Sequence, residues 1–112
     1  MDISNYDKLS QAILERLKIL DPLKIILFGS RAKGTSDKNS DIDLLVVLNI
    51  KGFPESFKEK MANHRKVRRL LADININVPM DIIVFTIEEW NRFLDDGSSF
   101  ATEIINNGKA IA

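Results

Sequence analysis

Apolar side chains recur at helical spacing near the start of the chain. The positions that carry them, three or four residues apart, are Ile3, Tyr6, Leu9, Ile13, Leu17 and Leu20. This spacing places the apolar side chains on one face of a helix, and Pro22 stands where such a helix would end. We therefore expect the chain to begin with an amphipathic helix.

Three short apolar runs predict buried strands. They span residues 24–28, 42–48 and 80–85, and runs of this length are typical of strands. The second run is almost entirely apolar, as a central strand covered on both faces would be. Gly52 and Pro54 follow this run and indicate a loop.

The segments between and after the strands predict further helices. Residues 55–72 carry apolar side chains on one side and Lys, Arg and Glu on the other, which indicates a long amphipathic helix. Thr86 is placed to cap the next helix, and a last helix opens at Ser98 or Ser99 and stops at Gly108. With a short helix in the turn after the first strand, this order predicts an α/β fold in which helices flank a small mixed sheet.

Length and charge indicate one small domain. At 112 residues the chain can bury roughly two-thirds of its unfolded surface, so we expect a single domain over residues 1–112. Its 16 basic and 16 acidic residues cancel, which argues against a surface adapted as a whole to nucleic acid. No apolar run is long enough to span a bilayer and the N-terminus has no secretory pattern, so we expect a cytoplasmic protein.

The residue types available limit the metal chemistry of the chain. There is no Cys, and His64 is the single histidine, so we expect neither a disulfide framework nor a metal site built on thiolates or histidines. A metal bound here would be held by oxygen ligands, which favours Mg²⁺ or Mn²⁺.

A small-residue turn and two carboxylates form the main motif of the sequence. Gly29 and Ser30 follow the first predicted strand directly, and Asp41 and Asp43 stand at the head of the second. Successive strand side chains point to opposite faces, so these two carboxylates share a face about 6.5–7 Å apart. The carboxylates can converge on a pair of ions, while the turn offers backbone N–H groups and a hydroxyl to phosphate oxygens. The motif therefore predicts a site in which divalent metal holds a triphosphate.

Other interpretations explain parts of this motif. Asp41 alone is explained as a turn residue and Asp43 as a capping or edge carboxylate, but neither explains two carboxylates on one face behind the turn. Residues 29–36 also match the glycine frame of a P-loop, but Thr35 stands where the lysine should be, so we reject a Walker-type NTPase. Of Arg31 and Lys33, we expect at least one to contact a phosphate.

The Gly-Ser turn, the ten intervening residues and the Asp-x-Asp pair resemble the nucleotidyltransferase superfamily, which includes DNA polymerase beta and kanamycin nucleotidyltransferase. The sequences at residues 29–34 and 40–44 are most similar to its minimal branch, the MNT proteins. Arg is common in that branch where this chain has Lys33, which keeps the charge but loses the planar guanidinium. The resemblance covers residues 25–85 and, more loosely, the tail. It implies a nucleotidyltransferase fold and metal-dependent transfer of AMP from ATP to a hydroxyl, with release of pyrophosphate.

Two-metal phosphoryl transfer also needs a carboxylate facing the attacking oxygen. Asp81 is the best candidate, because it begins an apolar strand that would lie beside the strand of Asp41 and Asp43. In the superfamily the third carboxylate lies on such a following strand, and Asp81 matches that position. The alternative is a strand-entry residue, in which case Asp73 or Glu88 comes next in line.

The resemblance assigns roles to these residues. It implies that Asp41 and Asp43 hold the metal ions that bridge the triphosphate, and that Asp81 completes the metal site on the acceptor side. It also implies that Gly29 and Ser30 bind the β- and γ-phosphates through the turn.

The resemblance also implies a partner. MNT proteins are typically encoded beside a helical HEPN protein, and the MNT antitoxin adenylylates a tyrosine of the HEPN ribonuclease toxin. Larger relatives carry an additional domain that binds the acceptor, so we expect the acceptor surface here to come from another chain. The sequence leaves open whether the chain also forms a homo-oligomer.

Two functions of other classes remain as alternatives. One is a non-catalytic antitoxin that neutralises its partner by binding alone, which the three candidate carboxylates argue against. The other is a nucleic-acid-binding module that uses the basic run at residues 64–69. On a helix these charges spread around most of the circumference, so a solvated or partner-facing surface is favoured. We interpret His64 as a surface residue within this run, and Trp90 and Phe93 as core or interface aromatics.

Overall fold

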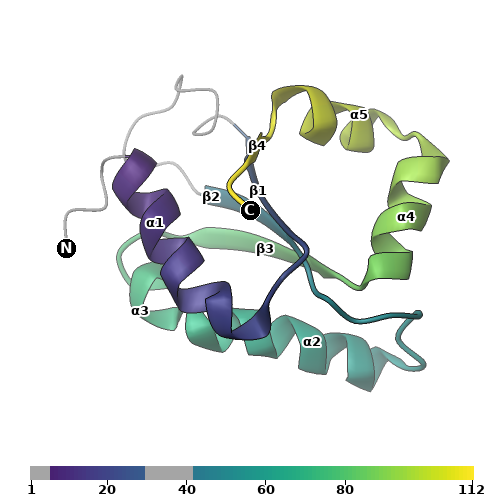
Figure 1. Cartoon of the computed structure of the whole chain (residues 1–112), viewed down its shortest axis with the longest axis horizontal. Coiled ribbons are helices and arrows are strands. Elements are labelled where there is room, and N and C mark those ends of the chain that lie inside the picture. Colours follow the sequence, from purple (N-terminus) through teal and green to yellow (C-terminus); the bar gives the residue numbers. More distant parts are fainter. Residues whose placement is uncertain (1–5, 30–41) are drawn as a thin grey trace.

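The computed structural model describes residues 6–29 and 42–112 (Figure 1). In chain order its elements are α1 (Tyr6–Leu17), the 3₁₀ turn η1 (Lys18–Leu20), β1 (Lys24–Phe28), β2 (Ile42–Val47), α2 (Phe57–Leu70), α3 (Ala72–Asn75), β3 (Met80–Phe85), α4 (Ile87–Asp96), α5 (Ser99–Asn107) and β4 (Lys109–Ala110). Among the residues in these two ranges, no helix is long and apolar enough to cross a membrane.

The strands form one sheet in the order β3-β2-β1-β4. β1 is antiparallel to both of its neighbours, whereas β2 and β3 run parallel. A parallel pair needs a crossover connection, and α2 and α3 provide it between β2 and β3. The predicted small mixed sheet flanked by helices is therefore confirmed.

One face of the sheet is closed by α1, α2 and α3, and we call it the α1–α2 face. Every second strand residue projects to this face, and those that are buried there are Ile25, Leu27, Ile42, Leu44, Val46 and Val84. Leu9, Ile13 and Leu17 of α1 pack against them, at the three- and four-residue spacing of an amphipathic helix. This face holds the main hydrophobic core.

The opposite face is covered by α4 and α5, and we call it the α4–α5 face. Figure 1 shows these two helices on the other side of the strands from α1 and α2. The cluster beneath them is smaller, and its buried members are Ile26, Phe28, Leu45, Val47, Trp90 and Ile104. Trp90 is therefore a core aromatic, as expected, and Phe93 packs against this cluster.

Side-chain caps set the starts of the later helices. The hydroxyl of Ser56 caps α2 and that of Ser98 caps α5, and each accepts a hydrogen bond from a main-chain N–H of the first turn. Thr86 and Glu89 form a reciprocal capping box at the start of α4. The expected cap at Thr86 is confirmed, and of the two serines expected at the start of the last helix it is Ser98 that caps it.

The outer edge of β3 is covered by side chains of α2. Nζ of Lys60 lies 3.4 Å from the carbonyl oxygen of Val84, and Nε2 of His64 lies 3.2 Å from that of Ile82. A carbonyl oxygen only accepts, so Nε2 carries the proton in this contact. The expectation that His64 is simply a surface residue is wrong, because its ring is partly buried against the strand edge. Covering edge carbonyls in this way opposes pairing with a further strand.

The structure also differs from the sequence expectations in the first helix, in the long helix after β2 and at the C-terminal strand. The first helix is α-helical only to Leu17 and tightens into η1, which ends at Asp21 in the left-handed conformation. The predicted helix over residues 55–72 ends at Leu70, because the backbone of Leu71 turns before α3 begins. The short strand β4 was not expected, since two exposed residues carry no alternation that could reveal it.

Candidate active site

Asp43 and Asp81 lie directly opposite each other on adjacent strands. In the parallel pair β2 and β3 they are register partners, and in the antiparallel pair β1 and β2 the partner of Asp43 is Phe28. Register partners project to the same face of a sheet, with Cβ atoms about 5 Å apart in antiparallel pairs. Asp81, Asp43 and Phe28 therefore form a row across three strands, at the end of the sheet where β1 ends and β2 and β3 begin. The predicted neighbouring position of the two strands is confirmed.

The carboxylates interrupt an apolar pattern on the α4–α5 face. The same-face residues further along β2 and β3 are Leu45, Val47, Ile83 and Phe85, and all of them belong to the apolar cluster or pack against it. Asp43 is half-buried and Asp81 is exposed. The two carboxylates thus lie at the rim of the cluster, where they remain within reach of solvent.

Gly29 is fitted to the carboxylate of Asp43. Its φ of +85° lies in the region that favours glycine, and a Cβ added there would overlap Oδ2 of Asp43 and come within 3.2 Å of its Cγ. A side chain at residue 29 would therefore displace the carboxylate. The turn after β1 and the head of β2 are in direct contact, as the Gly-Ser and Asp-x-Asp motif requires.

The donor set suits a divalent cation with a preference for oxygen. Two carboxylates from adjacent strands, beside a glycine turn, offer the hard ligands that Mg²⁺ and Mn²⁺ prefer. Within residues 6–29 and 42–112, no group of three or more His, Cys, Asp or Glu gathers closely enough to hold a metal. Ser30, Arg31 and Asp41, which the sequence also assigns to the site, lie outside those residues.

The two alternative carboxylates lie away from the row. Asp73, on α3, binds the guanidinium of Arg16 through Nη2 at 2.7 Å and Nε at 3.0 Å from Oδ2. This hydrogen bonding lowers the pKa of Asp73 and raises that of Arg16. Glu88 lies on α4, beyond the last residue of β3, whereas Asp81 lies at the start of that strand. Asp81 is the carboxylate that the fold brings beside Asp43.

Sequence reasoning missed the aromatic neighbours of the carboxylates. Phe28 lies in the same row, and the ring of Phe100 from α5 approaches it edge-on with centroids 5.7 Å apart. The alternation of Ile26 and Phe28 could have placed Phe28 on one face. The register with Asp43 and the approach of α5 come only from the tertiary structure.

Comparison with known proteins identifies the family. A model of the nucleotidyltransferase domain matches residues 7–108. No curated protein matches the sequence at a significant level.

Several solved structures share the fold. A toxin–antitoxin crystal structure with AMP-PNP is 21% identical with a TM-score of 0.59, covering 92% of this chain and 72% of that one. A putative nucleotidyltransferase from Sulfolobus solfataricus is 24% identical with a TM-score of 0.54, covering 93% and 76%. A mutant of the toxin–antitoxin MntA–HpeT is 18% identical with a TM-score of 0.54, covering 92% and 72%.

The family assignment rests on the sequence model, and the solved structures show the shared fold. Because the family model spans nearly the whole sequence, the chain belongs to the nucleotidyltransferase domain family.

Proposed function

We propose that this chain transfers AMP from ATP to a hydroxyl group of a partner protein and releases pyrophosphate. The observation that carries the proposal is the pairing of Asp43 with Asp81 on adjacent strands, with Gly29 against the carboxylate of Asp43. The bound AMP-PNP in a structure of similar fold supports an adenine nucleotide as the substrate.

Each residue of the motif has a distinct role in the proposed reaction. Asp41, Asp43 and Asp81 would hold Mg²⁺ or Mn²⁺, which supplies charge neutralisation for the triphosphate and polarises the acceptor hydroxyl. Gly29 and Ser30 donate main-chain N–H groups to the β- and γ-phosphates, and Arg31 contributes a cation beside them. Asp81 takes the proton of the acceptor hydroxyl, and the hydroxyl oxygen forms a bond to the α-phosphorus. The bond from that phosphorus to the bridging oxygen breaks, and pyrophosphate leaves.

A mutant among the solved structures supports the pair of aspartates. The MntA–HpeT mutant carries two Asp-to-Glu substitutions two positions apart, the same spacing as Asp41 and Asp43. Lengthening a carboxylate side chain by one methylene keeps the charge but moves the oxygens. Such a substitution is a natural probe of a site where the positions of the oxygens matter.

The partner in this proposal is a toxin. Two of the structures with this fold are toxin–antitoxin structures, which supports an antitoxin role for this chain. The resemblance of the motif to MNT proteins makes a helical HEPN protein the partner and a tyrosine hydroxyl the acceptor. Modification of that tyrosine would neutralise the toxin.

The test is a transfer assay with the protein encoded beside this chain. The chain is incubated with labelled ATP and Mg²⁺ in the presence of that protein, and mass spectrometry locates the residue that gains AMP. We expect a tyrosine of the partner to be labelled by the wild-type chain and by Asp96→Asn, an exposed aspartate at the end of α4, but not by Asp43→Asn. A partner that is neutralised without gaining label would instead show an antitoxin that acts by binding alone.

A further inference from the structure

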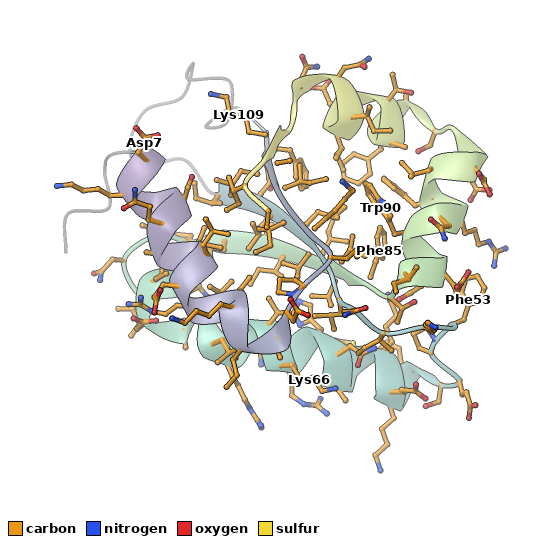
Figure 2. All side chains as sticks on the ribbon, viewed as in Figure 1. Asp7, Phe53, Lys66, Phe85, Trp90 and Lys109 are labelled. Atoms are coloured by element: carbon orange, nitrogen blue, oxygen red, sulfur yellow. The ribbon has the colours of Figure 1, made fainter. Side chains whose placement is uncertain are left out.

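A row of aromatic rings adjoins the carboxylates on the α4–α5 face. Phe28 contacts Phe100 edge-on, Phe100 contacts Phe93 at 5.9 Å and 79°, and Phe93 stacks on Trp90 at 5.8 Å and 28°. Figure 2 shows Trp90 and Phe85 between the strands and α4, in the interior of this cluster. The chain of ring contacts runs from Phe28 through Phe100 and Phe93 to Trp90, and both of its end rings are buried.

Phe100 lies between Phe28 and Phe93 and is much more exposed than the rings of Phe28 and Trp90. Phe28 is 8% exposed, whereas Phe100 is 45% exposed. The Phe100 ring makes edge-on contacts with both Phe28 and Phe93, which restrict its orientation although nearly half of it faces solvent. A ring held in this way loses little side-chain entropy when it contacts a ligand.

The exposed Phe100 ring lies near the carboxylates of Asp43 and Asp81. Opposite strand residues lie about 5 Å apart, and Asp43 is opposite Phe28. The Phe100 ring follows at 5.7 Å from that of Phe28, so it lies on the order of 10 Å from the carboxylate row. A planar group attached to a phosphate, or to a hydroxyl that attacks it, can reach such a ring.

We propose that Phe100 is a stacking platform for a planar ring that enters the active site. The ring is either the nucleobase of ATP or the aromatic ring of the acceptor side chain. Both sources present the same chemistry, a flat π-system beside a phosphate, and aromatic side chains stack with such rings. The inference rests on the proposed function, because it takes the carboxylate row as the place where the triphosphate binds.

Two other exposed phenylalanines provide a contrast. Phe53 and Phe57 are 51% and 78% exposed, but they line a hollow with Lys60 and Glu89, close to the end of β3. The carboxylate row is at the start of β3. Phe57→Leu therefore removes an exposed ring far from the proposed site and serves as the matched control.

The test compares ATP with tripolyphosphate, which carries the phosphates without the base. Calorimetry in Mg²⁺ gives both affinities for wild type, Phe100→Leu, Phe100→Trp and Phe57→Leu. If the platform binds the nucleobase, Phe100→Leu weakens ATP binding on the order of tenfold and leaves tripolyphosphate unchanged. Phe100→Trp keeps an aromatic ring and therefore binds ATP like wild type. Phe57→Leu binds both ATP and tripolyphosphate like wild type. Fluorescence of Trp90, the single tryptophan of the wild-type chain, verifies that the ring cluster stays folded in Phe100→Leu and Phe57→Leu.

The acceptor arm of the test measures the KM for the partner protein. If the platform binds the acceptor ring, Phe100→Leu raises this KM about tenfold with unchanged ATP affinity, and Phe100→Trp restores it. Unchanged ATP affinity together with unchanged KM would refute the platform, as would an equal loss for ATP and tripolyphosphate. A wild-type chain that binds neither phosphate compound would refute the proposed function itself, so the two failures are distinguishable.

Discussion

The two faces of the sheet use the same strands for different purposes. On the α1–α2 face every position of β1, β2 and β3 is apolar from one end to the other, and three helices close it. On the α4–α5 face the apolar positions give way to Asp43 and Asp81 at one end, and the cover consists of two helices with an aromatic cluster. The continuous face holds the core, whereas the interrupted face carries the candidate chemistry.

This division is possible because side chains alternate along a strand. Leu44, fully buried on the α1–α2 face, is the immediate neighbour of half-buried Asp43 on the other face. A strand that is fixed by its core side presents its opposite side chains in a defined place. The site therefore gains its rigidity from residues that never contact a substrate.

The largest effects are expected at the neighbouring residues Asp43 and Leu44, and they should differ in kind. Asp43→Asn is expected to abolish transfer with little change in stability, because it removes a ligand charge at a rim that solvent reaches. Asp41→Asn is expected to do the same. Leu44→Ala is expected to lower the free energy of unfolding by about 2–5 kcal/mol, the range for a buried leucine.

Single-turnover transfer and urea unfolding of each variant measure the two effects. Wild-type transfer by Asp43→Asn would refute its role as a ligand. Equal losses in the free energy of unfolding for Asp43→Asn and Leu44→Ala would show that both faces contribute to stability alike, against the proposed division.

The next effect distinguishes the two carboxylates of the row. If Asp81 serves the acceptor side, Asp81→Asn should reduce transfer at least about a hundredfold while leaving Mg²⁺-ATP affinity within a few-fold of wild type. Calorimetry gives the affinity, and single-turnover transfer gives the rate. Near-normal turnover would mean that Asp81 is a strand-entry residue and that the third carboxylate lies elsewhere.

A smaller effect is expected at the turn. Gly29→Ala should weaken Mg²⁺-ATP binding on the order of tenfold, because its methyl group displaces the Asp43 carboxylate and blocks close approach to the backbone. Gly52→Ala is the matched control, since its φ of +82° imposes similar backbone strain but no atom lies within 4 Å of the added Cβ. Gly29→Val should also weaken Mg²⁺-ATP binding far more than Lys38→Ala does. Equal effects of the two alanine variants in calorimetry would assign the loss to strain alone.

Much of this arrangement could be predicted from local sequence. The apolar character and length of the runs predicted all three longer strands. Thr86 and the pair Ser98 and Ser99 indicated two helix starts, because a capping side chain acts within one turn. The position of Asp81 on a strand beside that of Asp43 was expected from the resemblance to the nucleotidyltransferase superfamily.

The rest depends on contacts between residues distant in sequence. The ring of His64 meets the edge of β3, and that of Phe100 meets Phe28, only after the sheet has formed. The break at Leu71 and the pairing of β4 likewise lack a local signal, since neither a helix breaker nor an alternating run marks them.

The smallest effect concerns Asp73, the carboxylate on the α1–α2 side. Asp73→Asn should leave transfer unchanged, because this side chain pairs with Arg16 rather than with the row. Arg16 lowers the pKa of Asp73 below its ordinary value of 3.8, so the pair stabilises the folded chain above that pH and loses its contribution as the pH falls through the lowered pKa. The pair is solvent-exposed, so the loss of stability at neutral pH should be small and should vanish in strong acid and at high salt. Thermal unfolding of wild type and variant between neutral and acid pH measures the difference. A large loss of transfer in Asp73→Asn would move the third carboxylate to the other face and overturn the division between them.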